Sequence, residues 1–412
     1  MRRARTRPAA LVAAIALATT TTAVPAGTTA AAPASGTRPA VFVGNNWDGT
    51  ADVIDPDDHR RLARIDIVPD RAERMREIHT DPVRLAYFLG IRTLIGEGHD
   101  QLVDDMFSTP DGRLLIVSRP SFGDVVAVDL RDRGIAWRFR VAGQRADHMA
   151  VSPDGATVAV SASTANVVHL LDTRTGAEVG RFPSGDSPHE NNYSRDGRRI
   201  YHASIGFVYT PLDHPALDST KGQRYFQVVD AESATVLRRI DMGKKLAEAG
   251  YPNMSSAVRP MAHTADERYF YLQVSFFHGF VEYDMVEDRV TRVAPLPNLV
   301  PDLPRERYLL DSAHHGIAMD GTDRTLCVAG TMSDYAAIVD RATFRHTLVP
   351  GGEDAKPYWA TRSADGRHCY VSWSGTDQVS VISFDTAEEV ARIDVGDHPQ
   401  RIRTGVVPAD LG

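Results

Sequence analysis

Residues 149–182 read MAVSPDGATVAVSASTANVVHLLDTRTGAEVGRF and contain four short runs of strand-forming residues separated by turns. The first turn, Ser152-Pro153-Asp154-Gly155, joins the run 149–151 to the run 158–160. A second turn, around Gly176, precedes the last run. Short runs bounded by Gly, Asp and Pro are typical of β-strands joined by tight turns. This stretch therefore predicts a four-stranded antiparallel unit.

The same unit recurs along the chain. Copies of the turn begin at Thr109, Ser194 and Ser363, with degenerate copies at Thr264 and Asp320. A second marker, the apolar third run of each unit, ends at Asp55, Asp129, Asp172, Asp230, Asp284, Asp340 and Ser383. The turns at 109, 152 and 194 follow one another at intervals of 43 and 42 residues. Four strands in about 43 residues indicate a β-propeller blade.

The two ends of the repeat array complement each other. The first unit, residues 41–67, lacks its innermost strand, and a lone strand at about 401–407 follows the last complete unit. If that strand completes the first blade, the ring has no free edge. We therefore predict an all-β, seven-bladed propeller over residues 37–412 that is closed by its C-terminal strand.

The last unit has features of a known repeat. Its second strand reads Cys369-Tyr370-Val371-Ser372, and the runs 379–382 and 395–399 follow at the expected spacing. This pattern resembles the YVTN family of β-propeller repeats. The resemblance implies the propeller fold, but such propellers serve as binding proteins, lactonases, lyases and electron-transfer subunits. It therefore implies no single chemistry.

The N-terminus has the order of a secretory signal. Residues 2–7 include four arginines, residues 9–18 are apolar, and a Thr-, Ala- and Pro-rich stretch continues to residue 36. The apolar part is too short to span a bilayer. We interpret residues 1–36 as a signal peptide and linker; the sequence favours export by the Sec route and leaves the twin-arginine route as the alternative. The mature protein is expected to be secreted or extracytoplasmic, without a transmembrane segment.

Charge and motifs narrow the classes of function. The net charge is −8 and the 46 Lys and Arg residues are scattered, so nucleic acid is not an expected partner. The sequence has no serine-hydrolase elbow, phosphate-binding loop or haem-attachment motif in a suitable context. A Ser-His-Asp nucleophile is therefore not expected.

Four long insertions fall on connections that share one face of the predicted ring. They cover residues 68–103, 205–225, 243–258 and 296–312. The first insertion contains a helix signal, Asp81 followed by Pro82, within a helical segment of about 69–102. Because loops on a rigid scaffold build binding sites, we expect a ligand pocket on this face.

The residues just before each innermost strand should surround the mouth of the axial channel on the same face. They are Asp104, Asp105, Asp147, His148, His189, Glu190, Arg259, His314, His315, Tyr358, Trp359, Gln400 and Arg401. Neutral imidazole is a common metal ligand and a general base. We therefore assign His148, His189 and His315 as ligands of a divalent metal (Zn, Mn, Cu or Fe) or as acid/base groups.

The remaining candidates are one further catalytic residue and five residues that would bind the substrate. Tyr358 joins the histidines as a catalytic candidate, and the candidates for binding the substrate are Arg259, Arg401, Trp359, Glu190 and His278. His148 lies one position out of register with the other two histidines, so polar channel lining without a metal is an open alternative.

Two classes of function follow from these candidates. The first is a lyase or hydrolase that acts on a small or oligomeric, polar or anionic substrate at the channel mouth. The second is a non-catalytic propeller that binds a ligand or a protein partner with its loop face.

The two cysteines, Cys327 and Cys369, fall on the second strands of adjacent blades. Their positions place them on faces that confront each other, and an exported protein meets oxidising conditions. Facing sheets are about 10 Å apart, however, whereas a disulfide requires Cα atoms within about 7 Å. This spacing favours two buried thiols and leaves the disulfide as the alternative.

Overall fold

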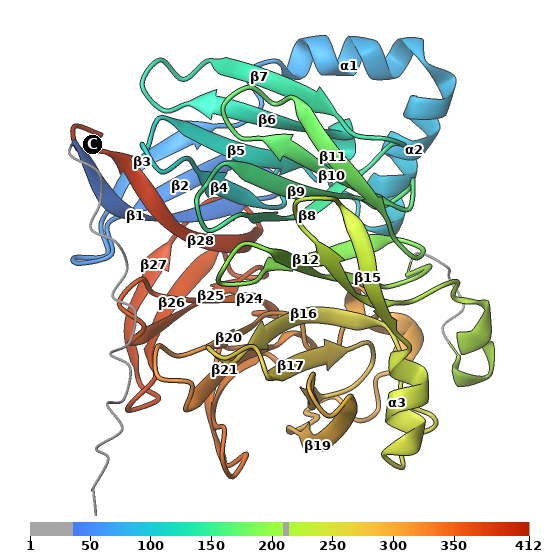
Figure 1. Ribbon diagram of the computed structural model, residues 1–412. Coiled ribbons are helices and arrows are strands. Elements are labelled where there is room, and N and C mark those ends of the chain that lie inside the picture. Colours follow the sequence, from blue (N-terminus) through green and yellow to red (C-terminus); the bar gives the residue numbers. More distant parts are fainter. Residues whose placement is uncertain (1–35, 209–213, 412) are drawn as a thin grey trace, which may run out of the picture.

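The computed structural model describes residues 36–208 and 214–411, which form seven four-stranded antiparallel sheets around an axis (Figure 1). The segment interpreted as a signal peptide lies outside the described residues, except for Gly36. None of the helices in the described part of the chain is long and apolar enough to cross a membrane.

Each sheet is one blade, with its strands ordered from the axis outward. Blade 1 consists of β28 (Pro399–Pro408), β1 (Thr37–Asn45), β2 (Thr50–Ile54) and β3 (Arg61–Asp66). Blade 2 consists of β4 (Met106–Ser108), β5 (Leu114–Arg119), β6 (Asp124–Asp129) and β7 (Ile135–Arg140). Blade 3 consists of β8 (Ala146–Val151), β9 (Thr157–Ala162), β10 (Val167–Asp172) and β11 (Glu178–Pro183). Blade 4 consists of β12 (Pro188–Tyr193), β13 (Arg199–Ser204), β14 (Phe226–Asp230) and β15 (Thr235–Ile240).

The remaining blades follow the same order. Blade 5 consists of β16 (Val258–His263), β17 (Tyr269–Val274), β18 (Gly279–Asp284) and β19 (Arg289–Pro295). Blade 6 consists of β20 (Ile317–Met319), β21 (Thr325–Gly330), β22 (Tyr335–Asp340) and β23 (His346–Pro350). Blade 7 consists of β24 (Pro357–Arg362), β25 (His368–Trp373), β26 (Gln378–Ser383) and β27 (Glu389–Asp394).

The ring closes as the sequence predicts. β28, from the C-terminus, pairs with β1 in a register that runs from Thr37 opposite Pro408 to Asn45 opposite Pro399. These two strands, coloured red and blue, lie side by side in Figure 1. The pairing leaves blade 1 with four strands and confirms the seven-bladed propeller.

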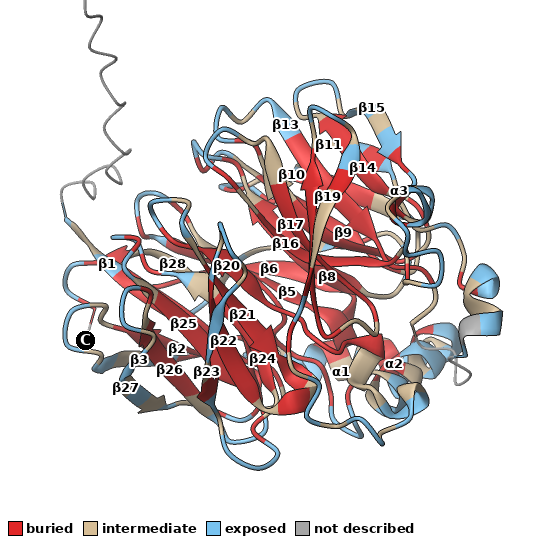
Figure 2. Cartoon of the chain, turned by 90° about the horizontal axis from the view of Figure 1, so that it is seen from below, coloured by how far each residue is buried: buried red, intermediate tan, exposed pale blue. Residues whose placement is uncertain are grey.

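The hydrophobic core lies between the blades rather than in one central cluster. One cluster of buried side chains joins each pair of adjacent blades in the described chain, including blade 7 to blade 1 through Trp359, Tyr370 and Val41. Inner and middle strands are buried, whereas much of the outer strands is exposed (Figure 2). The innermost strands are therefore fixed on both sides, and they position the residues at the channel.

Two helices fill the insertion between blades 1 and 2. α2 (Pro82–Leu94) begins as predicted, because the Asp81 side chain accepts hydrogen bonds from the Val83 and Arg84 N–H groups. α1 (Arg71–Thr80) precedes it within the predicted helical segment, although its highly charged sequence gives no separate signal for where it starts and ends. A third helix, α3 (Met242–Glu248), lies in the insertion between blades 4 and 5 and was not predicted.

The expectation of two buried thiols is wrong: Cys327 and Cys369 form a disulfide, with a Cα–Cα distance of 6.4 Å. Blades 6 and 7 approach more closely than the usual spacing of facing sheets. The Gly316 N–H donates to the Tyr358 carbonyl (2.9 Å), and the Gly321 N–H donates to the Gly366 carbonyl (3.0 Å). A Cβ at residue 316 would lie 2.3 Å from the Ala360 nitrogen, so glycine permits this approach.

Loss of the disulfide should destabilise the protein. The bond spans a sequence separation of 42 residues. Chain-entropy arguments give a loop of that length about 4 kcal/mol of stabilisation. We expect a Cys327→Ala/Cys369→Ala variant to lose about 2–4 kcal/mol of unfolding free energy in urea titrations. Thiol titration of the unfolded, unreduced wild type should detect no free thiol, and two free thiols would contradict the bond.

Candidate functional site

A cavity of about 320 Å³ lies on the face that carries the insertions. Its lining includes Ile91 from the first insertion, Ile205 from the second and Leu310 from the fourth. The innermost strands contribute a polar base that includes His148 and His189. Loops that are far apart in the sequence thus share one cavity, as their placement on one face predicts.

A β-bulge presents the polar residues in five of the seven blades. In β8, Asp147 and His148 together oppose the single residue Ser161 of β9. The equivalent pairs are His189 and Glu190, Arg259 and Pro260, Tyr358 and Trp359, and Gln400 and Arg401. A bulge interrupts the alternation of side chains along a strand and can redirect one of them. Two consecutive side chains per blade therefore lie near the channel.

Three of the predicted histidines meet at the cavity: His148 and His189 line its base, and His315 lies beside them outside the described lining. Ligand nitrogens of His148, His189 and His315 all lie within 4.8 Å of one another, although they come from blades 3, 4 and 6. The Nδ1 atoms of His148 and His189 are 2.8 Å apart. All three residues are buried. The bulges explain why the one-residue difference in register does not keep His148 away from the others.

Burial keeps these imidazoles neutral. Desolvation, together with nearby arginines, lowers the pKa of His148, His189 and His315 well below the ordinary value of 6.5. Glu190 lies with its Oε2 atom 2.7 Å from His148 Nδ1, and burial raises the pKa of Glu190 to about 7. The site thus holds three imidazoles in the form that ligates metals and accepts protons.

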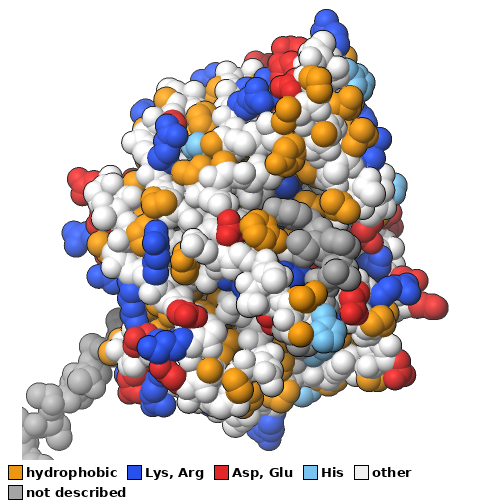
Figure 3. Space-filling view, turned by 90° about the vertical axis from the view of Figure 1, so that its right-hand side faces the viewer, with side chains coloured by type: hydrophobic (Ala, Val, Ile, Leu, Met, Phe, Trp, Pro, Cys, Tyr) orange, Lys and Arg blue, Asp and Glu red, His pale blue; other side chains and the backbone are white. Residues whose placement is uncertain are grey.

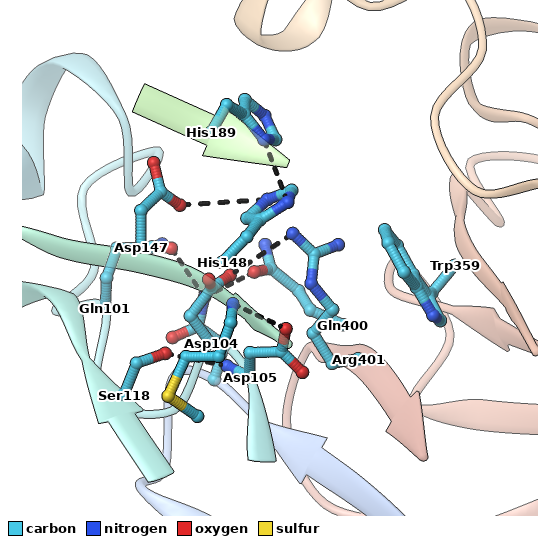
Figure 4. A network of polar contacts seen from close by, with 12 residues as sticks. Gln101, Asp104, Asp105, Ser118, Asp147, His148, His189, Trp359, Gln400 and Arg401 are labelled. Carbon is cyan, nitrogen blue, oxygen red and sulfur yellow. Dashed lines mark hydrogen bonds and ion pairs between the residues drawn. The ribbon is translucent and has the colours of Figure 1, made fainter. Parts of the chain in front are cut away.

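Two aspartates form a second candidate ligand set together with His148. Asp104, Asp147 and His148 also place ligand atoms within 4.8 Å of one another, with His148 Nε2 3.7 Å from Asp147 Oδ1 (Figure 4). Arg145 pairs with Asp147. Burial raises the pKa of Asp104 to about 7. Because an arginine already neutralises Asp147, this group is less suited to a cation than the three histidines.

Arg401 is a buried cation with few partners. Its side chain is fully buried, and its guanidinium lies 3.8 Å from the Trp359 ring and 3.8 Å from Asp104 Oδ1 (Figure 4). None of its three side-chain nitrogens makes a hydrogen bond within the described part of the chain. Buried charges are normally paired, so this guanidinium is a candidate for an anionic ligand.

The remaining predicted residues divide into two groups. Arg259 and Tyr358 line the cavity, and Tyr358 stacks on His315 with ring centroids 4.1 Å apart. Burial raises the pKa of Tyr358 to about 12, which makes its hydroxyl a donor at neutral pH. His278 instead lies 2.9 Å from the Tyr308 hydroxyl and is absent from the described lining of the cavity.

Sequence reasoning missed Arg145 and the wall formed by α2. Arg145 directly precedes β8 and lines the cavity, so its position next to a bulge was the available signal. The wall residues include Tyr87, Ile91 and Leu94. Their spacing predicts an apolar helix face but does not show what that face contacts.

Comparisons with known proteins support the fold. Kuenenia stuttgartiensis hydrazine synthase aligns with a TM-score of 0.54 and 15% identity, covering 74% of this chain and 95% of that one. Dihydro-heme d1 dehydrogenase NirN, in complex with DHE, aligns with a TM-score of 0.55 and 15% identity, covering 88% of this chain and 74% of that one. No protein-family model matches the sequence, and no curated protein matches it.

Fold and site together define a class. The protein is a seven-bladed β-propeller with a histidine- and arginine-lined cavity at one end of its channel. At 15% identity the solved structures show the fold alone, and the YVTN assignment stays a prediction.

Because the buried histidines are neutral, the unfolding free energy should depend on pH. The unfolded chain takes up protons as the pH falls through 6.5, whereas the buried histidines do not, so unfolding becomes easier below that pH. We expect His189→Gln to reduce this dependence by up to about 1.4 kcal/mol per pH unit, measured by urea unfolding in EDTA between pH 6.5 and 4.5. The matched control is His214→Gln, at an exposed position. Equal slopes for wild type and His189→Gln would contradict neutral burial of His189.

Substitution of Arg401 by an apolar residue should raise the unfolding free energy. Replacing a buried, poorly paired charge with an apolar side chain of similar length removes a desolvation cost, and Asp104, 3.8 Å away, can take up a proton because its pKa is already about 7. We expect Arg401→Met to raise the unfolding free energy by about 1–3 kcal/mol without ligand. Arg403→Met is the comparison, because Arg403 makes two 2.8 Å hydrogen bonds to Asp105 and its loss should destabilise the protein. A destabilised Arg401→Met would show that the guanidinium is adequately paired.

Proposed function

We propose that the protein is an extracytoplasmic propeller enzyme, of lyase or hydrolase type, that acts on an anionic substrate at the channel mouth. The observation that carries the proposal is the convergence of His148, His189 and His315, the first two of which line the base of a cavity. Three neutral imidazoles from three blades form a ligand set suited to Zn, Mn, Cu or Fe.

The surrounding groups support catalysis rather than passive lining. A divalent metal held by the histidines would supply Lewis-acid chemistry or a bound water of lowered pKa. Independently of a metal, His148 and Glu190 form a hydrogen-bonded pair in which Glu190 has a pKa of about 7, as acid/base catalysis near neutral pH requires. The Tyr358 hydroxyl, protonated at neutral pH, can donate a hydrogen bond to developing negative charge.

The substrate and the compartment follow from other features. Arg145 and Arg259 line the cavity together with Asp147 and with Asp104, whose pKa is raised to about 7 by burial, and this balance of charge favours an anionic group. The disulfide between Cys327 and Cys369 supports an oxidising compartment, which agrees with the signal-like N-terminus.

Metal analysis tests the proposal. In protein purified without chelator, we expect about one equivalent of a transition metal by elemental analysis, lost in His148→Ala and in His189→Ala. His278→Ala is the matched control, because that histidine lies outside the triad, and it should retain the metal. Melting curves establish that each variant is folded.

Three results would change the proposal. No metal in any sample would remove the metal mechanism and leave the acid/base pair. If the His278→Ala variant lost its metal as readily as the triad variants, the metal would not be bound at the three histidines. A ligand that binds at the cavity but is never converted would support the alternative, a non-catalytic binding propeller.

A further inference from the structure

The cavity has two chemically different zones. Its base is polar and includes Arg259 and Asp147, which are buried, and Arg145, which is partly buried. Its wall is apolar and is formed largely by one side of α2, with Tyr87 and Leu94 exposed at 44% and 56%. Since the wall is exposed and the base is not, the apolar zone lies nearer the mouth.

The apolar side chains of α2 exceed what its packing requires. Phe88 and Ile91 are buried, and Phe88 packs in a cluster with Leu102 and Phe122. Tyr87 and Leu94 belong to the same helix and line the cavity without joining that cluster. On the surrounding face, hydrophobic, basic and acidic side chains are interspersed (Figure 3). An apolar wall inside a cavity is therefore a local feature.

Gly90 is a second, independent indication that this space is used. It lies within α2 and lines the cavity, and a Cβ built on it meets no atom within 4 Å. Glycine inside a helix is less stable than alanine by about 0.5–1 kcal/mol, and no neighbouring atom here excludes a side chain. The glycine keeps the cavity open at a cost to the helix.

We propose that the substrate is amphipathic, with an oxyanion head group at the arginine-lined base and a short alkyl chain or single ring along α2. This inference rests on the proposed function and specifies its substrate class. The cavity of about 320 Å³ has the volume of roughly ten water molecules, which fits a head group with a short tail. The polar oligomer that the sequence allowed would leave the α2 wall without apolar contacts.

At the base, the head group would meet two guanidinium groups. Arg145 and Arg259 both line the cavity, alongside Asp104 and Asp147. An oxyanion is the group that such donors bind most strongly.

A series of carboxylates of increasing chain length tests whether the cavity binds an alkyl tail. Butyrate, hexanoate and octanoate would be titrated into the purified protein by calorimetry. Burial of each methylene is worth about 0.8 kcal/mol, so the affinity should rise about fourfold per methylene. Hexylamine, which has the same tail and the opposite charge, should not bind. A flat series, no binding by any of the acids, or equal binding of hexylamine would overturn the proposal.

Variants of α2 locate the effect. Leu94→Ser and Gly90→Leu should flatten the chain-length dependence, the first by removing apolar contact and the second by filling the cavity. Gly90→Leu should melt no lower than wild type, so that lost binding is not lost folding. The matched control is Leu89→Ser, since Leu89 is 47% exposed on the same helix and is not among the lining residues. An equal effect of Leu89→Ser would contradict the assignment to the cavity.

Metal content, measured on the same samples, separates this inference from the proposed function. Metal retained with a flat ligand series would contradict the amphipathic substrate and leave the metal site intact. A steep series in metal-free protein would support the amphipathic pocket and remove the metal from the mechanism.

Discussion

The antiparallel pairing of β28 with β1 is the contact on which the site depends. It places C-terminal residues on the inner strand of blade 1, next to blade 2. Arg403 therefore makes two hydrogen bonds to Asp105, and Arg401 lies 3.8 Å from Asp104, although each pair is almost 300 positions apart in the chain. The channel is therefore walled on all sides by inner strands, and the buried cluster between blades 7 and 1 fixes their spacing. Without this closure, the polar groups of blades 1 and 2 would face open solvent and lose the desolvation that sets their ionisation.

Within that ring, the bulges convert a regular scaffold into a site. A flat strand would direct only alternate side chains to one face. By opposing two residues to one, the inner strands bring both Asp147 and His148, or both His189 and Glu190, near the axis. The residues opposite are small: Ser161 faces one pair and Ala203 the other. Small partners leave room for the displaced side chains, so the geometry is built into the backbone and not into any one motif.

The closure of the ring and the bulges also explain which parts of the fold and of the site could be predicted from the sequence. Repeated turns and complementary chain ends are local patterns, and they sufficed for the blade count, for closure by the last strand and for the start of α2. The convergence of the three histidines was predictable only as a hypothesis, because a bulge leaves no clear signal in the alternation of residues. The disulfide and the bounds of α1 were missed for tertiary reasons: glycines allow blades 6 and 7 to approach, and Arg119 bridges Asp70, the residue before α1, to Asp124 of blade 2.

The charges around the channel indicate how its ligands would act together. The neutral histidines offer ligand nitrogens to a cation, whereas Arg145 and Arg259, which line the same cavity as His148 and His189, attract an anion. Binding either ion alone would leave a net charge where solvent cannot screen it. A cation at the histidines and an oxyanion near the arginines would stabilise each other, so each ligand should raise the affinity of the other by the same factor. A tail bound along the apolar wall would strengthen this coupling by excluding water from the base of the cavity.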